Sequence, residues 1–237
     1  MIEETLQIAD QTLSLVRKDI KNVHLTVRPP DGKIRIAAPL RMERRVISSF
    51  AITKLPWIRR QQKKLQKQER EEAREFLNRE SHYVWGRRYL LEVSEVDAPV
   101  SISAGTTKLH FQHRQHASQA QKQAAFDQWH RQLVREKATE LIAIWERKLG
   151  VQAGKLFIQK MKTKWGSCNP QSGAIRLNSE LAKKPLRCLE YVIVHELAHL
   201  IEPNHGPKFV QTLDRHLPDW QHRKEELSVS PGHLAEI

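Results

Sequence analysis

Four residues in the last quarter of the chain have types and spacing that suit metal chemistry. Residues 191–205 read YVIVHELAHLIEPNH, in which His195, Glu196, His199 and His205 form the pattern H-E-x-x-H-x-x-x-x-x-H. An H-E-x-x-H pattern is expected by chance only about 0.04 times in a chain of this length and composition. The pattern therefore predicts a site at which these side chains act together.

A helix is the element that makes this spacing useful. Apolar residues recur at intervals of three or four after Pro185, which can open a helix at its first turn. Four residues apart on one helix face, His195 and His199 can bind the same ion. Glu196 lies about 100° further around the helix. There its carboxylate can reach a water held by the metal and act as a general base.

His205 is the expected third ligand. Pro203 disfavours helical geometry at Glu202 and has no backbone N–H, so the helix should stop there and the chain can return His205 to the ion. Three neutral imidazoles with one open position are typical of catalytic zinc. A structural zinc site would normally be closed by a fourth Cys or His, and Cys168 is the nearby candidate.

The first half of the chain reads as strands with helices. VHLTVRPPDGKIRIAAP alternates apolar and polar residues around a Pro-Pro-Asp-Gly turn, which predicts a β-hairpin. Helical spacing begins near Glu43, and Pro56 favours two helices meeting there over one continuous rod. Residues 83–112 return to strand character with a turn at Ala104-Gly105.

In the second half of the chain the spacing of apolar residues changes from that of strands to that of a helix. An apolar stripe over residues 119–149 predicts a long helix that Gly150 ends, and KLFIQKM predicts a strand. We therefore expect an α+β protein, with an antiparallel β-rich region and helices over residues 1–118. A helical region with a small sheet follows over residues 119–237. The boundary is soft because no linker marks it, and no internal repeat is visible in the sequence.

Charge and cysteine content narrow the class of protein. The 237 residues carry 40 basic and 27 acidic side chains, a net charge of +13. The run KLPWIRRQQKKLQK, residues 54–67, has six bases and no acid, which suits either a solvated helix face or a nucleic-acid contact. Cys168 and Cys188 form no disulfide framework. With no leader-like or membrane-spanning segment, the sequence indicates a cytoplasmic protein.

The part of the sequence around the histidine motif resembles a known family. The run KTKWGSCNPQSGAIRLNSELAKKPLRCLEYVIVHELAHLIEPNHGPKF is similar to the signature of the YgjP-like metallopeptidases, a zincin group related to SprT-type proteases. The resemblance implies that His195, His199 and His205 bind zinc and that Glu196 is catalytic. Glu202 replaces a metzincin glycine and no methionine follows Met161, so the chain departs from the metzincins.

The resemblance implies a polypeptide substrate. In zincins a strand beside the active-site helix presents backbone groups to an extended peptide, and IQKMKTKWGSC, residues 158–168, precedes the helix in that order. Trp165 in this segment equally suits packing of the core. Oxyanion stabilisation has four candidates that the sequence does not separate, namely Tyr191, His216, His222 and Arg223. Two alternatives stay open: a protease associated with nucleic acid, and a non-catalytic module stabilised by zinc.

Overall fold

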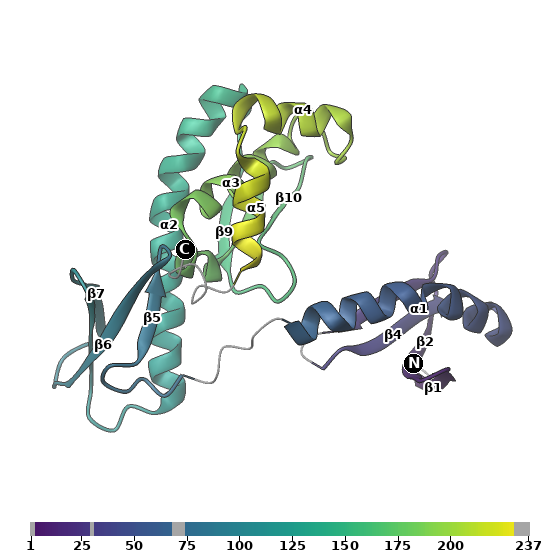
Figure 1. Ribbon diagram of the computed structural model, residues 1–237, viewed down its shortest axis with the longest axis horizontal. Coiled ribbons are helices and arrows are strands. Elements are labelled where there is room, and N and C mark those ends of the chain that lie inside the picture. Colours follow the sequence, from purple (N-terminus) through teal and green to yellow (C-terminus); the bar gives the residue numbers. More distant parts are fainter. Residues whose placement is uncertain (1–2, 29–30, 68–73, 230–237) are drawn as a thin grey trace. The chain divides into compact units, whose positions relative to one another are not determined.

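The computed structural model describes residues 3–28, 31–67 and 74–229 of the chain. It forms two compact units, Met1–Arg70 and Glu71–Ile237 (Figure 1). The units thus divide near residue 70 and not near residue 118. The reason is aromatic packing, because Phe126 of the long helix lies 4.9 Å from Phe76 and 5.0 Å from Phe111 between ring centroids.

The first unit is a four-stranded sheet followed by one helix. Its elements are β1 (Glu3–Ile8), β2 (Gln11–Lys18), β3 (His24–Arg28), β4 (Lys33–Pro39) and α1 (Arg44–Lys67). The strands lie in the order β1-β2-β4-β3, and the expected hairpin is confirmed as the antiparallel pair β3 and β4. The Pro29-Pro30 part of its turn lies outside the described residues.

The prediction of two helices meeting at Pro56 is wrong. Helix α1 runs through Pro56, although a proline inside a helix removes one hydrogen bond at a cost of about 3 kcal/mol. Ile47 and Ala51 before the proline and Ile58 after it are fully buried in one core with the sheet. Because both halves of the helix bury side chains in this core, their packing offsets the missing bond.

The second unit begins with another four-stranded sheet and a long helix. Its elements are β5 (Ser81–Val84), β6 (Arg87–Glu95), β7 (Ser101–Ala104), β8 (Lys108–His113) and α2 (Gln119–Leu149). Ser118 caps α2 in a capping box, and Gly150 ends it in the left-handed conformation at φ 67°. The turn at Gly105 between β7 and β8 is confirmed by a 2.9 Å bond from the Gly105 N–H to the Lys108 carbonyl.

These two sheets have the same topology. The order β5-β6-β8-β7 repeats β1-β2-β4-β3, and in each sheet the central pair is parallel while both outer pairs are antiparallel. The sheets are therefore mixed and not wholly antiparallel as expected. The chain contains a structural repeat of four strands and a helix that its sequence does not reveal.

The remainder of the second unit carries the predicted site. Its elements are β9 (Leu156–Gln159), β10 (Gly166–Cys168), β11 (Ile175–Asn178), the 3-10 helix η1 (Ser179–Lys183), α3 (Leu186–Ala198), α4 (Pro207–His216) and α5 (Trp220–Ser228). The small sheet has the order β10-β11-β9, so β10 is an edge strand. The expected α+β class, with a small sheet in the second half, is confirmed.

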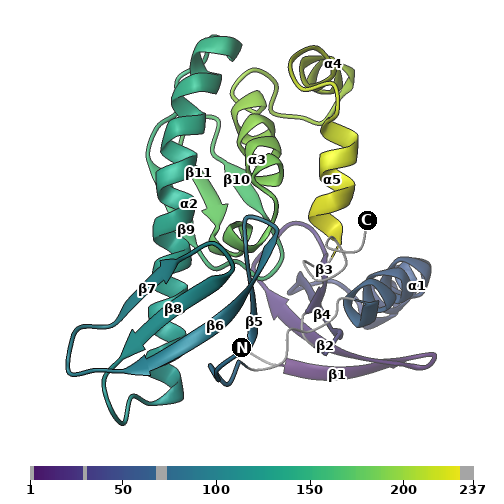
Figure 2. The same ribbon diagram turned by 60° about the vertical axis from the view of Figure 1, so that its left-hand side comes forward.

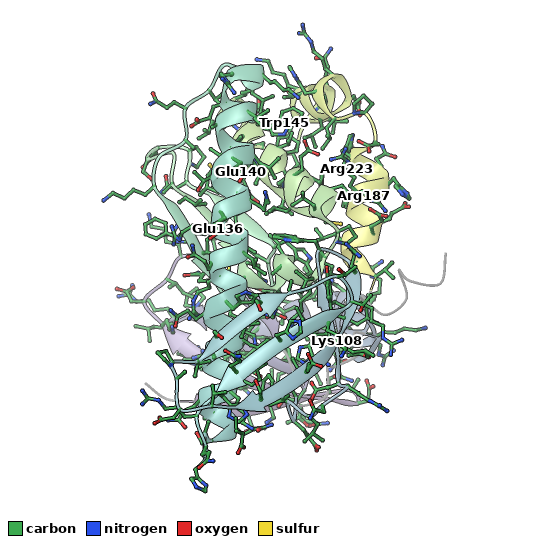
Figure 3. The ribbon with its side chains drawn as sticks, turned by 90° about the vertical axis from the view of Figure 1, so that its left-hand side faces the viewer. Lys108, Glu136, Glu140, Trp145, Arg187 and Arg223 are labelled. Atoms are coloured by element: carbon green, nitrogen blue, oxygen red, sulfur yellow. The ribbon has the colours of Figure 1, made fainter. Side chains whose placement is uncertain are left out.

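Helix α2 joins the two parts of this unit (Figure 2). Its first half supplies Phe126 to the core under β5–β8, and its second half supplies Val134, Ala138 and Trp145 to the core around α3. Figure 3 shows Trp145 near the end of α2, with Arg187 on α3 and Arg223 on α5. The Trp145 indole donates to Glu190 at 3.0 Å, and Arg223 donates to the same carboxylate at 2.5 Å. This network fixes α2, α3 and α5 together.

Candidate metal centre

The three predicted histidines come together in the structure. His195 lies in the last turn of α3, His199 is the residue that caps this helix, and His205 follows in the loop before α4. One ring nitrogen from each lies within 4.8 Å of the others. His195 Nε2 and His205 Nε2 are 3.1 Å apart.

The chain reverses after α3 where the sequence places Pro203. The helix closes with bonds from the Leu200, Ile201 and Glu202 N–H groups to carbonyls at Leu197 and Ala198, at 2.9 to 3.0 Å. No helical element includes Pro203, and α4 begins at Pro207 after the N-cap Gly206. The turn brings His205 back beside His195, as the position of Pro203 predicts.

Neighbouring groups orient the imidazoles. His199 Nδ1 lies 3.3 Å from the Glu202 carbonyl, so a proton on Nδ1 leaves the Nε2 lone pair free to bind a cation. Phe209 of α4 is buried and packs against all three imidazoles, with ring centroids 5.0, 4.8 and 4.7 Å from those of His195, His199 and His205. Burial lowers the pKa of His195 to about 4 and also lowers the pKa of His199, which keeps both rings neutral.

Glu196 is buried beneath the edge strand β10. Its side chain accepts a hydrogen bond from the backbone N–H of Cys168. A Cβ atom on Gly166 would lie 2.5 Å from Glu196 Oε1 and 2.8 Å from Val192 Cγ1, so only glycine fits at this position. Burial raises the pKa of Glu196 to about 7, against the opposing effects of Lys164 and the Cys168 N–H.

The loop before β10 is held by a single buried side chain. Asn178, at the end of β11, donates to the carbonyls of Met161 at 2.8 Å and Lys164 at 2.9 Å. It also accepts from the N–H groups of Met161 and Glu180, both at 3.2 Å. These hydrogen bonds hold the loop in one conformation, which places β10 over Glu196. Trp165, next in the chain, is partly buried against the core, as the packing interpretation expects.

The remaining candidates separate by their contacts. Tyr191 is the oxyanion candidate that packs on the triad, with its ring 5.8 Å from that of His195. Arg223 is bound to Glu190 and Asp219, and His222 lies 3.7 Å from Glu226. The Asp214 carboxylate accepts a hydrogen bond from the Trp220 indole at 2.7 Å.

Sequence reasoning missed three residues of the site, namely Gly166, Asn178 and Phe209. Gly166 and Asn178 lie far from the motif in sequence, and only the fold brings them to Glu196 and β10. Phe209 had a weak signal, because it is an aromatic residue four positions after His205.

The residues present fit a zinc ion. Two nitrogens that both lie about 2.0 to 2.1 Å from a tetrahedral ion are separated by about 3.3 Å. The 3.1 Å between His195 Nε2 and His205 Nε2 is close to this value. No cysteine or carboxylate joins the three imidazoles in a cluster of ligand atoms within the described residues, which leaves a three-nitrogen set.

Comparison with known families agrees with this geometry. The family model described as YgjP-like, metallopeptidase domain, matches residues 21–230. The chain belongs to the YgjP-like family. The match spans both compact units of this YgjP-like chain, so a metallopeptidase assignment rests on most of its length.

Two solved structures show more limited similarity to this YgjP-like chain. One is the metallopeptidase zymogen jannalysin of Methanocaldococcus jannaschii, at 23% identity and a TM-score of 0.35, over 38% of this chain and 87% of that chain. The other is the metallopeptidase zymogen abylysin of Pyrococcus abyssi, at 21% identity and a TM-score of 0.36, over 38% of this chain and 90% of that chain. No curated protein matches the chain. None of the described helices is long and apolar enough to cross a membrane.

Proposed function

We propose that the chain is a zinc-dependent peptidase in which His195, His199 and His205 hold the ion and Glu196 is the general base. The observation that supports this most is the juxtaposition of three imidazole nitrogens within 4.8 Å and a buried carboxylate on the next residue of the same helix. When bound, zinc in such a site supplies Lewis acidity that lowers the pKa of water and polarises a carbonyl oxygen.

Glu196 performs the proton transfers in this proposal. It takes a proton from the attacking water and delivers it to the leaving amine as the peptide bond breaks. The Cys168 N–H fixes the carboxylate, and Gly166 leaves room for it beneath β10. Because these contacts come from the backbone, the carboxylate is positioned before substrate arrives.

The edge strand β10 is the proposed binding element for a polypeptide. Its inner edge pairs antiparallel with β11, and its outer edge has no strand partner within the small sheet. An extended peptide can add to such an edge through main-chain hydrogen bonds. An open depression over the start of α4, lined in part by His205, Lys208 and Gln211, exposes the His205 side of the site to solvent.

A non-catalytic zinc module is less well supported. Such a site needs a fourth protein ligand, and Cys168 was the candidate. The Cys168 thiol is absent from the cluster of ligand atoms among the described residues.

A cytoplasmic location stays part of the proposal, because Cys168 and Cys188 are both free thiols.

Replacement of Glu196 by Gln tests the proposal, because the amide keeps the shape of the side chain and cannot accept the proton. We expect hydrolysis of a peptide library to fall by about 10²- to 10⁴-fold while zinc content by mass spectrometry stays at the wild-type value. Wild-type activity that is insensitive to chelation, or full activity in the Gln variant, would contradict the mechanism.

A further inference from the structure

The positive charge of the chain is concentrated in the first unit. Residues 1–70 carry 16 basic and 7 acidic side chains, a net charge of +9, whereas residues 71–237 carry 24 and 20, a net charge of +4. The 70 residues of the first unit therefore hold most of the total net charge of +13. An excess of one sign in so small a unit favours a partner of the opposite sign.

Helix α1 holds half of these bases. Its 24 residues include eight Lys and Arg and no Asp or Glu. The structural repeat supplies a comparison, because α2 follows the same four-stranded topology and starts 11 residues after the start of its last strand, as α1 does. Helix α2 has six bases and four acids. Glu136 and Glu140 lie on its exposed face, where Figure 3 labels them.

Matching the two helices position by position shows where the bases of α1 are unusual. The equal spacing equates residue n of α1 with residue n + 75 of α2. Arg59 and Lys63 then correspond to Val134 and Ala138, which are buried beside α3 in the second unit. At these positions α2 carries the apolar side chains that hold the peptidase core, whereas α1 carries exposed bases. The charge of α1 is therefore no requirement of the shared fold.

The bases of α1 form a ridge with two aromatic residues. Phe50, Lys54, Trp57, Arg60 and Lys63 follow one another at intervals of three or four, so each is a neighbour of the next on the helix surface. Lys54 lies 5.8 Å from the centre of the Phe50 ring, and Trp57 is 36% exposed. Lys54, Arg60 and Lys63 are exposed, and in the described part of the chain no carboxylate lies within 4.0 Å of them.

We propose that this ridge of α1 binds single-stranded nucleic acid. A regular line of cations matches a polymer with one phosphate per nucleotide, and an exposed aromatic ring among the cations offers a surface on which a base can stack. An anionic membrane fits less well, because the apolar face of α1 is already buried against its own sheet and cannot enter a bilayer. The inference does not depend on the proposed peptidase activity.

Binding of labelled oligonucleotides to the full-length protein tests the proposal. We would measure fluorescence anisotropy with 30-nucleotide single-stranded DNA, with RNA of the same sequence and with the DNA duplex, at 50 and 200 mM salt. The test variant carries Lys54→Gln, Arg60→Gln and Lys63→Gln, which keep the helix-forming character of each position. The control variant carries Arg131→Gln, Arg135→Gln and Arg147→Gln, which removes three exposed charges from α2 instead.

We expect the wild-type protein to bind both single-stranded oligonucleotides. The difference between its affinities for DNA and RNA shows which sugar is preferred. The α1 variant should lose about tenfold or more in affinity, and its slope of log K against log salt should fall by about 2. The α2 variant should stay within about twofold of the wild type. Trp57→Leu should weaken single-strand binding by about tenfold and change duplex binding much less.

Four outcomes would overturn the inference. These are no binding at 50 mM salt, equal losses in the α1 and α2 variants, preferential binding to vesicles that contain phosphatidylserine, and displacement of the oligonucleotide by poly-glutamate at equal charge concentration. Circular dichroism of each variant confirms that the fold survives. Because all the substitutions leave His195, Glu196, His199 and His205 unchanged, peptidase activity is scored separately.

Discussion

At the scale of single residues, we expect His205 to decide whether the proposed site can hold zinc. The other two imidazoles come from adjacent turns at the end of one helix, and two ligands alone hold zinc weakly. We expect His205→Ala to lower zinc affinity by orders of magnitude and to abolish hydrolysis, while far-UV circular dichroism is unchanged because His205 is exposed. Zinc content by mass spectrometry gives the answer. Tightly held, stoichiometric zinc in this variant would show that another group is the third ligand.

Gly166 limits where the side chain of Glu196, the proposed general base, can lie. An added methyl group would lie 2.5 Å from Glu196 Oε1, so either the carboxylate or β10 has to move. We expect Gly166→Ala to reduce kcat by about 10²-fold, since displacement of a catalytic group by about 1 Å has an effect of this size. Zinc content should stay the same, which separates this effect from loss of a ligand. Gly105→Ala, far from the motif in a turn of another sheet, serves as the control and should retain activity.

At the scale of elements, the loop before β10 depends on Asn178. Its buried side chain makes four hydrogen bonds to backbone groups, including both ends of residues 161–164. Asn178→Ala leaves these groups without partners, and we expect the free energy of unfolding to fall by about 2 to 3 kcal/mol and activity to fall with it. Urea denaturation measures the first effect.

Asn169 provides the matched control for this element. Its side chain also accepts from two backbone N–H groups, those of Gln171 and Ser172, but it lies in an exposed turn. We expect Asn169→Ala to cost about 1 kcal/mol or less, because water replaces the lost partner. Equal destabilisation by the two substitutions would mean that Asn178 has no special role in holding the loop.

The sequence predicts the helices and strands themselves better than it predicts which strands pair and in which direction. The spacing of His195 and His199 is local, so the convergence of their two imidazoles follows from helix geometry alone. The parallel pairing of β2 with β4 does not follow, because alternation of apolar residues is the same for either direction of a neighbouring strand. The structural repeat cannot be seen in the sequence, because residues at matching core positions of the two repeats differ in chemical type. Leu55 of α1, for example, corresponds to His130 of α2.

At the scale of the whole molecule, buried histidines make the second unit sensitive to acid. Burial lowers the pKa of His82 to about 4 and the pKa of His130 to about 3, with Arg74 and Lys183 respectively adding to the effect. Both values lie below the ordinary value of 6.5, so below that pH the unfolded chain binds protons that the folded chain excludes. The contribution of these two histidines to stability is therefore complete above about pH 6.5 and falls as the pH drops toward 4. At pH 5 the loss is about 2 kcal/mol for each histidine.

His130→Leu tests this dependence, and Leu55 is the residue at the matching position of the first repeat. We expect the difference in unfolding free energy between pH 7.5 and pH 5 to shrink by about 2 kcal/mol in this variant. Tryptophan fluorescence in urea reports mainly on the second unit, which contains five of the six tryptophans. EDTA in all samples removes any contribution from metal release. An unchanged pH dependence would show that His130 is not the responsible group.

The matched topology of the two repeats has a consequence for how the chain reaches its fold. During refolding each helix meets two sheets of identical strand order, and exchange between similar neighbouring modules is a common route to misfolding. The helices differ in volume at the matched core position, where α1 has Ala51 and α2 has Phe126. Phe126 would overpack the aliphatic core of the first unit, and Ala51 would leave a cavity beside Phe76 and Phe111. The difference in core volume therefore favours the packing of each helix on its own sheet.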